Sequence, residues 1–225
     1  MTRTQRQNLI AVGAIAAILA GCFAYTTHQE RELTRSIVAL VTDSSARLQA
    51  AIAIESDGPT AESAANQEKL NEHTAAADLH YDTLRGLHAA PVWPLADAAD
   101  DYVHGAREII RRKAASHRYQ FEMAASLQSL RDHMRADNRT GPWVTAAIRA
   151  KQRLEKDYRD YRLATEALVK LLDAYAASRA KLSVQLASVP LLEGSAAEQA
   201  RTRAVAELGR AAAEAGQVGR LAAYR

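Results

Sequence analysis

The chain has 225 residues and a mass of 24.5 kDa, which is enough for one good-sized domain with its own core and short for two. Hydrophobic residues make up 48% of it and charged residues 24%, a composition that excludes a chain disordered throughout. The net charge of +3 is a small surplus, so we expect no nucleic-acid partner, and the single cysteine, Cys22, excludes an intramolecular disulfide.

The first 25 residues have the pattern of a segment that enters a membrane. Arg3 and Arg6 precede an uncharged apolar run over residues 9–25. Residues 9–20 alone suit the apolar part of a signal peptide, whereas the whole run just reaches the length of a spanning helix. Because the basic side of such a segment stays in the cytoplasm, we expect the chain from about residue 26 onward on the periplasmic side.

The sequence Leu19-Ala20-Gly21-Cys22 resembles the lipobox of bacterial lipoproteins. The resemblance covers the first 22 residues only. It implies cleavage after the site formed by Leu19, Ala20 and Gly21, and lipidation of the Cys22 thiol. Two alternatives stay open. The apolar run continues through Phe23 without a Gly/Ser linker, which favours an uncleaved signal anchor, and a fully removed secretory signal is the third possibility.

Four short clusters rich in proline and glycine divide the rest of the chain, at residues 57–59, 91–94, 140–142 and 189–194. Between the clusters, apolar residues recur with helical spacing, and no alternating β-branched run is present. The pattern therefore predicts five helices, over residues 26–56, 61–89, 95–136, 143–188 and 195–222.

These elements predict an all-α fold, in which an N-terminal membrane or signal helix precedes an elongated antiparallel helical bundle with coiled-coil packing. Residues 1–25 would be the signal peptide or transmembrane anchor, residues 26–194 the bundle, and residues 195–225 a C-terminal helix with a frayed end that packs on the bundle. Short loops force neighbouring helices to be antiparallel. We expect two hairpins, of the first and second helices and of the third and fourth, with the fifth helix along them.

The fourth helix carries the clearest repeat in the chain. Its seam residues follow one another in alternating steps of four and three: Leu154, Tyr158, Tyr161, Thr165, Leu168, Leu172, Tyr175, Arg179, Leu182, Leu186 and Val189. This repeat of 3.5 residues demands a left-handed supercoil against partner helices. The tyrosines of the seam are expected to be core residues whose hydroxyls reach the rim.

Other residues are of types that can bind a metal ion or catalyse a reaction, but each has a structural interpretation. His73, His80 and His88 are at least seven residues apart, about 10.5 Å along a helix, which is too far for two of them to share a metal ion. His117 follows Lys113 by one turn, a polar pair that more often sets helix register than catalyses a reaction.

Charged and aromatic clusters are interpreted in the same way. The basic stretch 107–118 and the alternating charges of 155–162 indicate solvated helix faces. Trp93 and Trp143 each start a helix, and we expect them to close the bundle ends near one another.

We therefore predict a membrane-tethered, extracytoplasmic helical scaffold or interaction protein of the bacterial cell envelope. It would contact the membrane through its N-terminus, and protein partners or its own copies through its helical faces. No catalytic motif and no c-type haem motif is present, so neither an enzyme nor a cofactor is expected. The alternatives are a ligand-binding sensor bundle, which resembles chemoreceptor sensor domains in architecture only, and an enzyme or haem carrier.

Overall fold

The computed structural model describes the backbone of residues 3–55, 61–87, 92–135, 141–187 and 189–223. Side chains are described from residue 23 to residue 217, except at residues 56–61, 88–91, 93, 136–140 and 188. The described residues form five helices and no strand, which confirms the prediction of an all-α helical bundle. The helices are α1 (Arg3–Ala53), α2 (Ala61–Gly86), α3 (Trp93–Arg135), α4 (Gly141–Gln185) and α5 (Gly194–Ala223).

Helix α1 runs without a break past residue 25, from Arg3 to Ala53, so the apolar N-terminal segment and the helix predicted over residues 26–56 form one element. Neither proline nor glycine occurs between Gly21 and Ala53, so nothing in the sequence ends the helix. The hydroxyls of Thr26 and Thr27 both donate to the Phe23 carbonyl at 3.0 Å, a bond that helical threonines form within a continuing helix.

Among the residues whose placement is described, no helix is both long and apolar enough to cross a membrane. The predicted lipidation and cleavage residues, Leu19, Ala20, Gly21 and Cys22, lie outside the residues whose side chains are described.

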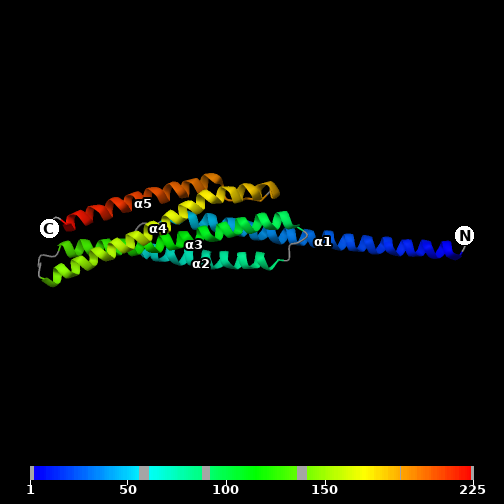
Figure 1. Ribbon diagram of the computed structural model, residues 1–225, viewed down its shortest axis with the longest axis horizontal. Helices are drawn as coiled ribbons and strands as arrows, with labels where there is room; N and C mark the ends of the chain where they lie inside the picture. The colour runs from blue at the N-terminus through cyan, green and yellow to red at the C-terminus, as the bar shows by residue number, and fades with distance from the viewer. Residues whose placement is uncertain (1–2, 56–60, 88–91, 136–140, 188, 224–225) are drawn as a thin grey trace.

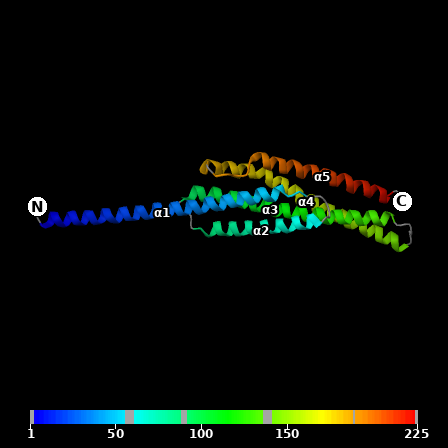
Figure 2. The same ribbon diagram turned by 180° about the vertical axis from the view of Figure 1, so that it is seen from behind.

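Helix α3 is the centre of the bundle, because it packs against each of the other four helices. Helices α1 and α2 pack against one another, as do α4 and α5, and α3 contacts both pairs. Both ribbon views show α1–α2 and α3–α4 as antiparallel hairpins with α5 along α4 (Figures 1 and 2). The sequence predicted the hairpins but not which helix would lie at the centre.

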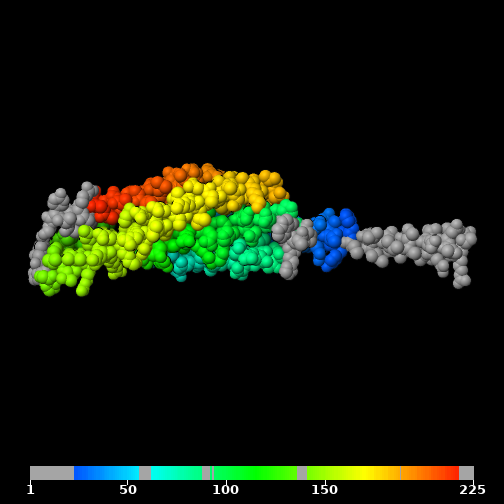
Figure 3. Space-filling view, viewed as in Figure 1, coloured from blue at the N-terminus to red at the C-terminus, as the bar shows by residue number. Residues whose placement is uncertain are grey.

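The buried residues form two separate clusters along the rod. The large core contains buried residues of α1, α2, α3 and α4, among them Ile37, Leu70, Ile109 and Leu172, and also Leu192, which lies just before α5. Half-buried alanines of α5 pack against this core: Ala196, Ala197 and Ala200. The small core contains residues of α3, α4 and α5 only: Met123, Leu127, Leu130, Leu154, Tyr161 and Ala211. Two cores exist because the α3–α4 hairpin extends past the α1–α2 hairpin, at the end far from the start of α1 (Figures 1 and 3).

The expected proximity of Trp93 and Trp143 is wrong. Helices α3 and α4 are antiparallel, so their first residues lie at opposite ends of a hairpin whose α3 arm alone has 43 residues. At the far end, Trp143 Nε1 donates to the His133 carbonyl at 2.9 Å, and the two rings stack with centroids 6.1 Å apart.

Candidate functional site at the junction of the two cores

A band of buried polar side chains separates the large core from the small core. Ser116 and His117 of α3 and Thr165 of α4 are each at most 7% exposed. Their hydroxyls and ring nitrogens cannot be hydrated by bulk water at this depth, so each needs a partner inside the protein. Ser116 Oγ and Thr165 Oγ1 provide this for one another at 2.8 Å.

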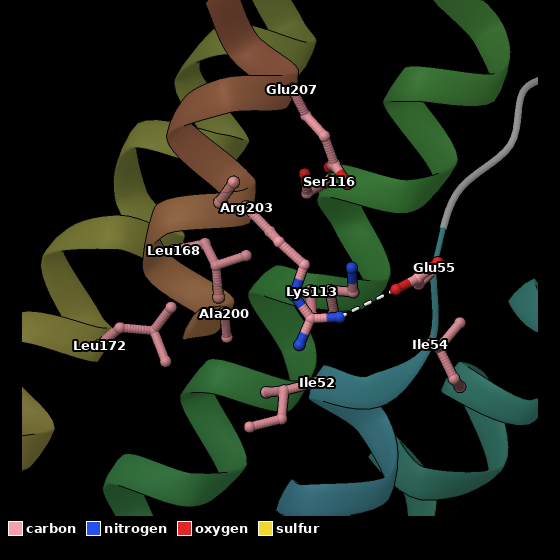
Figure 4. Close-up of a pocket in the computed structure, with 11 residues that line it drawn as sticks. Ile52, Ile54, Glu55, Lys113, Ser116, Leu168, Leu172, Ala200, Arg203 and Glu207 are labelled. Atoms are coloured by element: carbon pink, nitrogen blue, oxygen red, sulfur yellow. Dashed lines mark hydrogen bonds and ion pairs between the residues drawn. The ribbon is translucent and has the colours of Figure 1, made fainter. Parts of the chain in front are cut away.

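Beside this band lies a small hollow where the end of α1 meets α3, α4 and α5 (Figure 4). Its apolar wall includes Leu168 and Leu172, both of the α4 seam. Its cavity volume of about 20 Å³ is room for a single water molecule.

Four charged side chains also line the hollow: Glu55, Lys113, Arg203 and Glu207. Arg203 Nη1 pairs with Glu55 Oε1 at 3.1 Å, which connects α5 to the end of α1 (Figure 4). Burial lowers the pKa of Lys113 from its ordinary value; Glu207 opposes this shift and Arg203 adds to it. A desolvated lysine can act as a nucleophile, but a hollow of this volume admits water and no organic substrate.

His117 connects α3 to the first turns of α2. Its Nδ1 lies 3.0 Å from Gln67 Oε1, and its Nε2 lies 3.5 Å from Ser63 Oγ. Because the Gln67 oxygen only accepts, Nδ1 carries the ring proton and Nε2 accepts from the serine hydroxyl. Burial, with a further contribution from Lys113, lowers the pKa of His117, which keeps the ring neutral.

The histidines of α2 face α1 rather than a metal ion. His80 Nδ1 lies 3.4 Å from Ser44 Oγ, and both His73 and His80 are half-buried. Burial, and next the charge of Arg47, lower the pKa of both rings. His88 lies outside the described residues. Within the part of the chain that the structure describes, no group of three or more His, Cys, Asp or Glu side chains could hold a metal ion.

The seam residues of α4 lie on its inner face and belong to both cores. Leu154, Tyr158 and Tyr161 contribute to the small core, and Leu168, Leu172, Tyr175, Leu182 and Leu186 to the large one. Six of these eight side chains are buried, and Tyr158 and Leu186 are half-buried.

The expectation that the seam tyrosine hydroxyls reach the rim is wrong for Tyr161 and Tyr175, because both oxygens are enclosed. Burial raises the pKa of Tyr161 to about 12 and raises that of Tyr175 further. The Tyr175 ring packs 5.1 Å from the ring of Tyr102, and a Cβ at Gly105 would lie 3.4 Å from it.

Two charged stretches are less solvated than their sequences indicated. Asp157, within the alternating charges of α4, is 5% exposed and accepts a hydrogen bond from the buried Ser126 of α3. Arg107 Nε donates to Asp78 of α2 at 2.6 Å, and Arg111 Nη2 lies 2.8 Å from the same carboxylate oxygen. Burial alone would raise the pKa of Asp78, but its hydrogen bonds to the two arginines lower it more.

Sequence reasoning missed these pairs because both partners of a pair come from different helices, and periodicity within one helix does not show which charges meet across a bundle. No protein-family model matches the chain, and comparisons with curated proteins and with solved structures found no match either.

Proposed function

We propose that the chain is a membrane-tethered, extracytoplasmic helical scaffold or interaction protein of the bacterial cell envelope, without catalytic activity. The observation that carries the proposal is the continuity of α1. The helix that begins at Arg3 and includes the apolar run is also the first helix of the bundle, where Ile37, Val41 and Leu48 enter the large core. A tether at the run would therefore hold the bundle through one uninterrupted helix.

The part of α1 between the run and the core has the character of a stalk. Residues 26–36 span about 17 Å at 1.5 Å per residue, and most of their side chains are exposed. Phe23 and Tyr25, at the end of the run, are 71% and 65% exposed. Aromatic side chains at this position favour the boundary between lipid and water, which supports a membrane surface near residue 25.

The length of the bundle supports an interaction role. Helix α4 has 45 residues, about 68 Å at 1.5 Å per residue, and α3 is nearly as long. A rod of this length presents a large helical surface far from its tether, whereas the hollow at the core junction is no larger than a water molecule. Such a shape suits the recognition of another protein better than the turnover of a small molecule.

The test is the intact mass of the chain extracted from cell membranes, measured beside a Cys22→Ala variant. A mass that lacks residues 1–21 and includes acyl chains, with loss of the acyl mass in the variant, supports the lipoprotein form of the tether. A full-length, unmodified mass for both supports the signal anchor. As a control, deletion of residues 9–25 should move the chain to the soluble fraction. Recovery of the intact chain in the soluble fraction contradicts the proposal.

A further inference from the structure

Two hollows lie along α3, the first against the start of α2 and the second against α4. The first has a volume of about 230 Å³ and is lined by Ser63, Ala64, Gln67, His117, Arg118 and Phe121. The second has a volume of about 100 Å³ and is lined by Ala125, Ser126, Ser129, Ala150 and Arg153. We call the two together the α3–α4 groove.

The two hollows belong to one stripe of α3. Phe121, Ala125 and Ser129 follow one another at intervals of four residues, which places them on the same face of the helix. The same side of α3 contacts the first turn of α2, where Ser63 lies beside His117. Beyond Phe121, α3 continues to Arg135, about 21 Å of helix at 1.5 Å per residue, and both ribbon views show it extending past α1 and α2 (Figures 1 and 2). The groove thus lies where a helix in line with α2 would pack.

The floor of the groove is suited to close helix packing. Phe121 is 38% exposed, Ala125 is exposed, and Ala150 is half-buried, so the floor is one aromatic ring beside small side chains. The buried polar groups beneath it have internal partners, since Ser126 donates to Asp157 and His117 bonds to Gln67. The apolar stripe of a bound helix would therefore cover this floor without leaving Ser126 or His117 unpaired.

The flanks of the groove are basic. The side chains of Arg118 and Arg153 are 56% and 77% exposed, and their nearest acids, Glu122 and Asp157, are at 3.9 and 3.7 Å on their own helices. Residues 118–135 and 141–157, at this end of the hairpin, contain seven Lys and Arg against four Asp and Glu. An occupant with carboxylates along its edges would meet a complementary charge here.

The chain itself shows how this side of α3 accepts a helix. Helix α2 has five Asp and Glu against two Lys and Arg, and its Asp78 pairs with both Arg107 and Arg111 of α3. Arg118 follows Arg111 by seven residues, which places it on the same side of α3. At Arg111 an acid of α2 supplies the pairing charge, whereas Arg118 pairs only with Glu122 of its own helix among the described residues.

We propose that the α3–α4 groove binds an acidic amphipathic helix of a partner protein. That helix would continue the line of α2, with its apolar stripe against Phe121 and Ala125 and its carboxylates beside Arg118 and Arg153. The inference rests on the proposed function in one respect, because it places the partner in the compartment that the tethered bundle faces.

The test is photo-crosslinking of the full-length chain in its own membranes. A p-benzoylphenylalanine introduced in place of Phe121 or Ala125 should form an adduct whose partner peptide, identified by mass spectrometry, has an amphipathic helical pattern and a net negative charge. The same probe in place of Leu163, an apolar residue of α4 that is 53% exposed, is the matched control and should form no such adduct. The combined changes Arg118→Glu and Arg153→Glu should reduce the yield of the adduct about tenfold or more, because the two new carboxylates repel the carboxylates of the partner helix.

A second pair of charge reversals separates a local effect from a general one. Arg159→Glu with Arg162→Glu changes the same charge on exposed positions of α4, and Arg162 lies on the face opposite Arg153, so the adduct should persist. Thermal melting by circular dichroism checks that each variant is folded.

Several outcomes overturn the inference: no adduct, an equal adduct at position 163, an adduct with a second copy of the chain or with lipid, or an adduct that survives reversal of Arg118 and Arg153. The tether is tested by the mass measurement and does not depend on this result. Conversely, a soluble chain that forms the acidic-helix adduct would remove the proposed function and leave the groove assignment intact.

Discussion

Ser116 of α3 and Thr165 of α4 meet hydroxyl to hydroxyl, 2.8 Å apart, in the polar band between the two cores. The Thr165 hydroxyl also donates to the Tyr161 carbonyl at 2.9 Å, so its only proton is used and Ser116 is the donor of the pair. A shift of α4 along α3 by one turn would bring an apolar seam residue against the Ser116 hydroxyl. The pair therefore favours one alignment of α3 and α4.

Replacement of Thr165 by Val should destabilise the protein more than its small change in shape implies. Ser116 would lose its acceptor while it stays buried, which costs about 1–3 kcal/mol of unfolding free energy. Adding Ser116→Ala removes the stranded hydroxyl, so the double variant should be more stable than the sum of the two single changes indicates. Urea unfolding of the detergent-solubilised chain measures this, and additive effects within about 0.5 kcal/mol would show that the hydroxyls are not coupled.

The number and approximate ends of the helices could be predicted because they depend on local chemistry. Proline and glycine clusters interrupt the helical pattern, and the breaks before Ala61, Trp93, Gly141 and Gly194 fall where those clusters lie. At residue 25 the composition changes but no residue can end a helix, and α1 continues through this position.

The junction of the cores could not be predicted, because it depends on how far each hairpin reaches. The end of α1 brings Glu55 to Arg203, two residues 148 positions apart in the sequence. Asp157 resembles a surface charge in its sequence context, yet it lies beside the seam and is buried against Ser126. Such groupings follow from the stagger of the helices, which no single helix encodes.

Leu168→Ala and Leu172→Ala should each reduce the unfolding free energy by about 2–5 kcal/mol, because both leucines are 4% exposed in the large core and their truncation leaves a cavity. Leu163→Ala on the same helix is the control, since its side chain is 53% exposed, and it should change stability by about 0.5 kcal/mol or less. Urea midpoints at constant slope report the difference. Equal losses at all three positions would contradict the assignment of the inner face of α4.

Acidification should weaken the packing of α2. Burial lowers the pKa of His73, His80 and His117 in the folded chain. The charge of Arg47 lowers the pKa of His73 and His80 further, and the charge of Lys113 lowers that of His117 further. The unfolded chain, with ordinary histidines of pKa about 6.5, then binds more protons below that pH than the folded chain does. Stability is therefore fully present above about pH 6.5 and falls as the pH decreases through it.

Urea unfolding at several pH values between about 5 and 8 checks this dependence. A variant in which His73, His80 and His117 are all Gln should show a flatter profile over the same range, because amides do not titrate. A wild-type profile that rises toward acid, or a variant with the same slope as the wild type, would contradict the assignment of these rings as neutral groups of the folded state.

Gly209→Ala should stabilise α5. The glycine is exposed within the helix, and a Cβ there would meet no atom within 4 Å. Alanine in a helix interior is favoured over glycine by about 1 kcal/mol. The unfolded chain has less conformational freedom with alanine than with glycine, so folding loses less entropy, and the new methyl group clashes with nothing. Gly86→Ala is the matched control, since the same open space surrounds a glycine at the end of α2, where helix propensity matters less. Amide hydrogen exchange along α5 should slow in the first variant and stay unchanged in the second. Faster exchange in Gly209→Ala would mean that α5 needs a flexible backbone at this position to follow α4.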